Sequence, residues 1–106
     1  MSDLDLSIDC IGGNCPVEAE GTVNGKPFYF RARGEWWRIG IGGEPIISPE
    51  WDCGARFGQW PDAGWMTEEE AKGLIEKAAR RYADGLPGGD IAEWDSRAQF
   101  LEASDD

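Results

Sequence analysis

The sequence contains no histidine, and only 10 of its 106 residues are lysine or arginine. Histidine is the most frequent general base and metal ligand in proteins, so its absence excludes Ser-His and Cys-His catalytic pairs and the HExxH zinc motif. Binding of bare nucleic acid or of an anionic membrane is also disfavoured, because clustered Lys and Arg are needed to neutralise phosphate groups. We therefore expect no enzymatic activity, no metal or other cofactor, and no direct contact with nucleic acid or membrane.

The sequence also lacks long apolar runs and a large set of cysteines. A membrane-spanning helix needs about 20 predominantly apolar residues, and no basic segment followed by an apolar stretch opens the chain as in a secretory signal. Cys10, Cys15 and Cys53 are too few for a disulfide framework and match no familiar zinc-binding spacing. These features favour a cytoplasmic protein.

Negative charge and tryptophan are the residue properties in excess. The chain has 21 acidic residues, a formal net charge of -11 and six tryptophans. Its hydrophobic fraction of 41% is too high for a disordered acidic tail. Because domains most often have about 100 to 150 residues, we expect residues 1–106 to form a single domain.

Two dipeptide turns predict the register of three antiparallel strands. Asn24-Gly25 is typical of a type I′ hairpin turn, which requires positive φ at both central residues, and it pairs Ala19 with Phe30. Gly34-Glu35 is typical of a type II′ turn and pairs Phe30 with Ile39. Both turns place the apolar residues on one face of the sheet.

A fourth strand is predicted upstream, joined by a four-residue loop over residues 11–14. This loop sets Ile8 against Val17 and Cys10 against Cys15, either as two small core residues or as a disulfide. All four strands would then share one apolar face. That face contains Leu4, Leu6, Ile8, Cys10, Val17, Ala19, Phe28, Phe30, Ala32, Trp37, Ile39 and Ile41.

A helix is expected to cover the apolar face. Thr67 and Glu70 form a capping box, and Asp84-Gly85 ends the element. A shorter second helix is expected from Asp90. The helical apolar stripe contains Ala71, Leu74, Ile75, Ala78, Ala79 and Tyr82.

The segment from 44 to 66 is predicted to be an irregular, tryptophan-rich connection. A connection of this length is usually functional or hides a short element, and Ile46-Ile47 is a candidate for a brief strand. The fold class expected is α+β: a four-stranded antiparallel meander with one main helix packed on one face and a short C-terminal helix.

The acidic residues are unevenly distributed along the chain. Residues 1–20 carry five acids and no base, and residues 44–70 carry seven acids against Arg56. One interpretation is solubility, since a large net charge keeps a small protein dispersed. The other is a rigid array of carboxylates that takes the place of nucleic-acid phosphates. The candidate binding residues of this array are Asp3, Asp5, Asp9, Glu18, Glu20, Glu68, Glu69 and Glu70.

A second candidate surface is the sheet face turned away from the helix. One interpretation is a solvated face with cross-strand ion pairs, since Glu18 lies opposite Arg31. The other is a recognition face, because exposed Arg, Tyr and Trp are the residues that dominate binding hot spots. Its candidate binding residues are Tyr29, Arg31, Arg33, Trp36 and Arg38.

Small size, strong acidity, a one-layer sheet with a helix and the absence of catalytic groups together resemble small phage- or mobile-element-encoded inhibitors, especially anti-CRISPR proteins and DNA mimics. The resemblance is one of overall character and transfers no residue role. It implies a protein partner with a basic nucleic-acid-binding surface, namely a CRISPR effector or surveillance complex, in the bacterial host cell. The alternative is a small regulatory module that binds a protein through the Arg, Trp and Tyr face.

Overall fold

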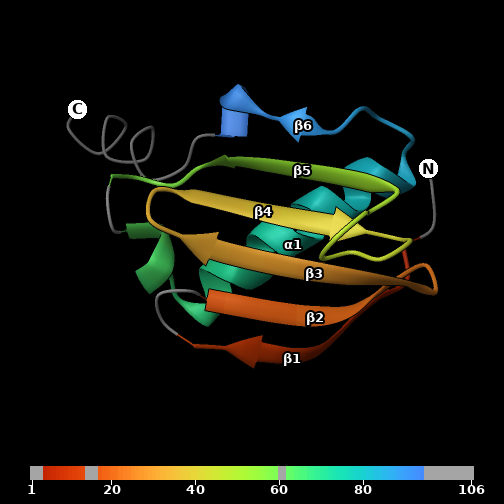
Figure 1. The fold of residues 1–106 in the computed structure, drawn as a ribbon, viewed down its shortest axis with the longest axis horizontal. Helices are drawn as coiled ribbons and strands as arrows, with labels where there is room; N and C mark the ends of the chain where they lie inside the picture. The colour runs from red at the N-terminus through yellow and green to blue at the C-terminus, as the bar shows by residue number, and fades with distance from the viewer. Residues whose placement is uncertain (1–3, 14–16, 60–61, 95–106) are drawn as a thin grey trace.

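A single six-stranded sheet dominates the computed structural model, which describes residues 4–13, 17–59 and 62–94 (Figure 1). The strands lie in the order β1 to β6; the first five are antiparallel neighbours, and β6 is parallel to β5. Helix α1 covers one face of the sheet (Figure 1). The elements are β1 (Leu6–Gly12), β2 (Val17–Val23), β3 (Lys26–Arg33), β4 (Trp36–Ile41), β5 (Trp51–Arg56), the 3-10 turn η1 (Asp62–Trp65), α1 (Glu68–Ala83), β6 (Gly89–Asp90) and the 3-10 turn η2 (Ala92–Trp94).

The predicted fold class is therefore wrong in two respects. The sheet is six-stranded and mixed rather than a four-stranded meander. The second helix expected from Asp90 is replaced by the short strand β6 and by η2, and its remaining part lies outside the described residues. Gly89 has a φ of 90°, which favours glycine and starts an extended segment rather than a helix.

The registers of β2, β3 and β4 are confirmed. Ala19 pairs with Phe30, and Phe30 pairs with Ile39. Asn24 and Gly25 have φ values of 50° and 81°, as a type I′ turn requires, and Gly34 has a φ of 67°.

The predicted pairing of β1 is wrong. Ile8 pairs with Gly21 rather than with Val17, and Cys10 pairs with Glu20. A β-bulge between Ile8 and Cys10 inserts one residue, so the side-chain alternation switches there. Cys10 is consequently exposed instead of lying in the core, and its predicted partner Cys15 is outside the described residues.

The segment from 44 to 66 contains β5 and η1, and the predicted strand at Ile46-Ile47 is wrong. Both isoleucines lie in an exposed turn, 67% and 79% accessible. In β5, by contrast, Cys53 and Ala55 are buried. Small side chains and a central glycine gave this strand little β-propensity, which is why it was not recognised.

The core lies between the inner sheet face and α1. Trp37 is fully buried, and its ring stacks on Phe30 at 5.8 Å and on Trp94 at 6.2 Å between ring centroids. The capping box is confirmed, because the Glu70 amide donates to Thr67 Oγ1 and the Thr67 amide donates to Glu70 Oε1. Five predicted stripe residues are buried and Tyr82 is partly buried; the buried ones are Ala71, Leu74, Ile75, Ala78 and Ala79.

The structure predicts that Gly21 tolerates no side chain. A Cβ at this position would overlap the Ser7 carbonyl oxygen and lie 2.7 Å from the Phe28 ring. We expect Gly21→Ala to lower the free energy of unfolding by about 1–3 kcal/mol, as overpacked sites do. Gly12→Ala is the matched control, because a Cβ on Gly12 meets no atom within 4 Å. Urea denaturation measures both, and equal stabilities would contradict the β1–β2 pairing.

Candidate functional site

The outer face is the sheet surface turned away from α1. Its side chains alternate with the buried residues of each strand. The β4–β5 connection folds over one end of this face (Figure 1), where a Cβ on Gly40 would overlap the Pro45 carbonyl oxygen. The charged and aromatic members of the outer face on β2 to β5 are Glu18, Glu20, Tyr29, Arg31, Arg33, Trp36, Arg38, Asp52 and Arg56.

An acidic strip occupies the β1–β2 side of the outer face. We define it as Asp5, Asp9, Glu18 and Glu20, all exposed. Ser7 Oγ donates to Asp9 Oδ1 at 2.9 Å, which places the bulged Asp9 side chain on the same face as Ser7. The bulge between Ile8 and Cys10 thus leaves the Asp9 carboxylate next to the Cys10–Glu20 pair.

The acidic strip forms no ion pair within 4 Å in the described part of the chain, although Arg31 is the cross-strand neighbour of Glu18. The side-chain hydrogen bonds that its carboxylates accept come from uncharged donors. The Ser7 hydroxyl donates to Asp9, and the Tyr29 hydroxyl donates to Glu18 Oε1 at 3.0 Å. The ion pairs that the structure shows involve other acids, namely Glu35, Glu50, Asp52 and Asp90. The strip therefore keeps its negative charge on a hydrogen-bonded sheet.

The remaining predicted acidic residues lie apart from the strip. Glu68, Glu69 and Glu70 form the first turn of α1, on the opposite side of the sheet, where the helix dipole favours anions. The Glu70 carboxylate is engaged in the capping box. Asp3 lies outside the described residues. The eight predicted acids therefore do not form one array.

The predicted residues of the outer face differ in their contacts, because Arg38 forms ion pairs within the protein and the others form none with the described residues. Arg38 bonds to Asp90 at 2.9 Å and to Asp52 at 3.3 Å, and these contacts, the Asp90 hydrogen bond first, raise the pKa of its guanidinium. It reaches Asp90 across Gly54, where a Cβ would lie 2.9 Å from Arg38 Cγ. Arg38 is thus a structural residue that ties β4 to β5 and β6.

The other members of this face remain available to a partner. Within residues 4–13, 17–59 and 62–94, no carboxylate lies within 4 Å of the exposed Arg31 or Arg33. Trp36 is 43% exposed. Burial and the Glu18 hydrogen bond raise the pKa of Tyr29, so its hydroxyl stays a donor at neutral pH.

Sequence reasoning missed a groove beside Arg31. A cavity of about 350 Å³ lies between Tyr29, Arg31 and Arg38 on the sheet and Ile46-Ile47 on the β4–β5 connection. The Lys26–Glu50 ion pair, 2.6 Å long, links this connection to the first residue of β3. The exposed isoleucine pair was the available signal, but it was interpreted as a strand.

The two described cysteines are expected to differ in reactivity. Cys10 is exposed, whereas burial raises the pKa of the Cys53 thiol to about 12. Because the thiolate is the nucleophile, about one Cys53 side chain in ten thousand is reactive at pH 8. We expect iodoacetamide to modify native Cys10 at least about a hundredfold faster than Cys53. Peptide mass spectrometry measures both rates; comparable native rates would contradict the burial of Cys53, and unfolding should abolish the difference.

Two further findings concern the described residues as a set. They contain no group of three or more Cys, Asp or Glu side chains arranged to hold a metal ion. None of their helices has the length and apolar character needed to cross a membrane. A comparison of the chain with protein-family models, curated proteins and solved structures finds no match.

Proposed function

We propose that this chain is a non-enzymatic inhibitor whose acidic strip occupies the basic DNA-binding surface of a nucleic-acid-handling protein. The observation that carries the proposal is that the four carboxylates of the strip are exposed and form no ion pair with the described residues, whose ion pairs involve other acids. CRISPR effector and surveillance complexes in a bacterial cytoplasm are the candidate partners. An inhibitor of this type needs no catalytic group, because it acts by occupying the groove.

The spacing of the strip limits how much nucleic acid it replaces. Asp5 lies level with Asn24, six residues along β2 from Glu18, which corresponds to about 20 Å at the usual strand rise. A single DNA strand carries one charge per about 3.4 Å of helix axis. Four carboxylates over this length therefore have fewer charges than one DNA strand, so the strip fits a groove that grips one phosphate backbone.

Competition with DNA tests the proposal. Purified CRISPR effector and surveillance complexes are incubated with the protein, and duplex DNA binding is then followed by fluorescence anisotropy. We expect one of these complexes to bind the protein and to lose DNA binding in proportion to its occupancy. Binding that leaves DNA affinity unchanged would refute phosphate mimicry, and failure of every complex to bind would refute the anti-CRISPR assignment.

A second candidate function is a regulatory module that binds a protein through Arg31, Arg33 and the isoleucine pair. The observation that favours it is that Arg31, which forms no ion pair among the described residues, lines one groove together with the exposed Ile46 and Ile47, while Arg33 lies farther along the same face of β3. The two candidate functions are distinguished by comparing partner binding of the variant Arg31→Ala/Arg33→Ala with partner binding of the variant in which the acidic strip is neutralised. If the arginine variant abolishes partner binding and the acidic variant does not, the regulatory function is supported and the inhibitor proposal fails.

A further inference from the structure

The groove on the outer face has one wall made of the β4–β5 connection. A Cβ on Gly40 would overlap the Pro45 carbonyl oxygen and lie 3.0 Å from Pro49 Cβ, so the connection rests directly on β4. The connection is braced internally, because the Ser48 amide donates to the Glu44 carbonyl oxygen at 2.7 Å and the Glu44 amide donates back at 3.3 Å. The groove is therefore closed along β4 at Gly40.

Ile46 and Ile47 present an aliphatic surface on this wall. They are 67% and 79% exposed, and both line the groove. The Ile47 amide donates to the Glu44 carbonyl oxygen at 3.0 Å, so the pair lies in a hydrogen-bonded turn. Adjacent exposed apolar side chains beside a groove are typical of interaction sites. The groove thus provides an apolar contact for a ligand.

Arg31 provides the cation of the groove that forms no ion pair with the described residues. Its cross-strand neighbours are Glu18 on β2 and Arg38 on β4. The one carboxylate that lines the groove, that of Asp52, is already bound to Arg38. Like charges directly opposite on neighbouring strands are destabilising. An anion that binds Arg31 would therefore be favoured at this position.

We propose that the groove binds the C-terminal carboxylate of a protein partner whose last residue is aliphatic. The guanidinium of Arg31 has parallel N–H groups that bind a carboxylate in a bidentate manner. The side chain of the same terminal residue packs against Ile46 and Ile47. Because a C-terminal residue carries its carboxylate and its side chain on one Cα, both fit into a single cavity of about 350 Å³. Closure at Gly40 favours a chain end over a segment that continues in both directions.

This inference rests on the second candidate function and names the chemistry of its partner. Capture of a terminal carboxylate is a recurrent mode of peptide recognition. The acidic strip takes no part in it, so the inhibitor proposal is tested by other measurements.

A short peptide tests the site in the full chain. The probe is acetyl-Gly-Gly-Val-Leu with a free C-terminal carboxylate, titrated into the ¹⁵N-labelled protein and followed by NMR. We expect saturable shifts of the Gly40, Ile46 and Ile47 amide signals. The C-terminal amide of the same peptide lacks the negative charge and should bind about tenfold more weakly or worse, as expected for loss of a hydrogen bond to a charged group. Acetyl-Gly-Gly-Gly-Gly, which keeps the carboxylate but lacks the aliphatic side chains, should also bind several-fold more weakly.

Substitutions in the groove test the two contacts separately. Arg31→Gln should weaken binding of the free-carboxylate peptide by about tenfold or more. Ile46→Ser/Ile47→Ser should weaken it several-fold, because the apolar contact is lost. The three side chains are exposed, so these variants are expected to keep the fold, and denaturation midpoints check this.

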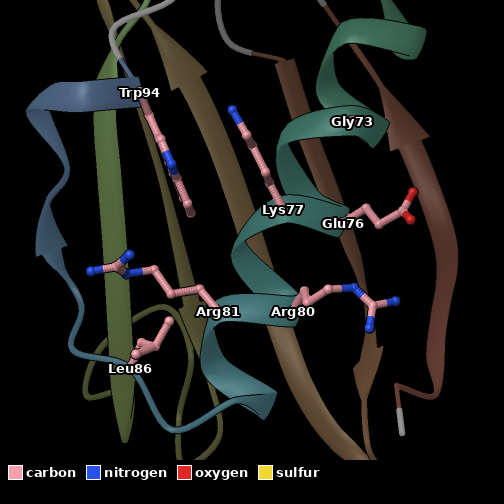
Figure 2. A pocket seen from close by; sticks show the side chains of 7 residues that line it. All are labelled: Gly73, Glu76, Lys77, Arg80, Arg81, Leu86 and Trp94. Atoms are coloured by element: carbon pink, nitrogen blue, oxygen red, sulfur yellow. The ribbon is translucent and has the colours of Figure 1, made fainter. Parts of the chain in front are cut away.

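Two control variants remove a cation outside the groove. Arg33→Gln changes the same face of β3 two residues farther along, at a position that does not line the groove. Lys77→Gln makes the same change in net charge on α1, where Lys77 lies beside Trp94 on the helix side of the sheet (Figure 2). Both controls should leave the affinity for the peptide unchanged.

Three results would overturn this site. The first is the absence of a saturable shift at Ile46 and Ile47 with the free-carboxylate peptide. The second is equal affinity for the C-terminal amide, which would remove the carboxylate from the ligand. The third is equal weakening by Arg31→Gln and Arg33→Gln, which would indicate nonspecific attraction. None of them would refute the second candidate function itself, because a partner without an aliphatic C-terminus can still lose binding in the variant Arg31→Ala/Arg33→Ala.

Discussion

Replacement of Trp37 with alanine is expected to lower the free energy of unfolding by about 3–5 kcal/mol. Trp37 is fully buried and stacks on both Phe30 and Trp94, so its removal leaves a cavity between the sheet and η2. Proteins of this size have a total stability of about 5–15 kcal/mol, so the loss is a large fraction of the whole. Chemical denaturation followed by circular dichroism measures it.

Trp36→Ala is the matched control for this substitution. The two tryptophans are neighbours on β4, but Trp36 lies on the outer face and is 43% exposed. We expect its replacement to cost less than about 1 kcal/mol, as is usual for surface positions. Equal losses at the two positions would contradict the assignment of the inner and outer faces of β4.

Neutralisation of the acidic strip is expected to have the largest effect on partner binding. The variant Asp5→Asn/Asp9→Asn/Glu18→Gln/Glu20→Gln should slow association with the partner by about 10- to 100-fold at low salt, because electrostatic steering accelerates association by such factors. Stopped-flow fluorescence or surface plasmon resonance measures the rate constant. Dissociation should change as well if the carboxylates contact the partner directly.

A control variant with the same change in net charge separates the strip from total charge. Glu44, Glu76, Asp84 and Glu93 are exposed and lie away from the strip. When both variants are compared at about 0.1 M salt, where the Debye length is about 10 Å, replacement of these control residues by Gln or Asn should change the association rate by less than about threefold, since exposed charges farther away than this are largely screened. If this control slows binding as much as the strip variant does, net charge alone accounts for the effect. The variant Glu68→Gln/Glu69→Gln tests separately whether the acidic first turn of α1 contributes to partner binding.

Local turn chemistry explains which parts of the fold were predictable. The Asn24-Gly25 and Gly34-Glu35 turns require positive φ values that few residues adopt, so they determined the register of β2, β3 and β4. The β1 register depends on a longer loop and on a bulge, neither of which has a unique dipeptide signal. Strand β5 could not be predicted, although its buried Cys53 and Ala55 alternate with Asp52, Gly54 and Arg56, because its small side chains and central glycine have little β-propensity and no recognisable turn precedes it.

The candidate site was predictable only in part for a related reason. Alternation along β2 and β3 placed Glu18, Glu20 and Arg31 on the outer face correctly. The ion pairs of Arg38 could not be predicted from the sequence. Its partners Asp52 and Asp90 lie on β5 and β6, and these strands come close to β4 only through pairing between segments that are far apart in the sequence. Strand pairing between distant parts of the sequence thus determines which charged side chains form ion pairs within the protein and which can contact a partner.

The most direct test of the proposed function is the salt dependence of partner association for the native chain and the acidic-strip variant. Between about 0.01 and 1 M salt the Debye length falls from about 30 to 3 Å, so steering by exposed carboxylates is progressively lost. We predict that the native association rate falls steeply over this range, while the rate of the variant is low throughout and nearly independent of salt. Parallel salt dependences for the two proteins would contradict the proposal that this strip is received by a positively charged groove.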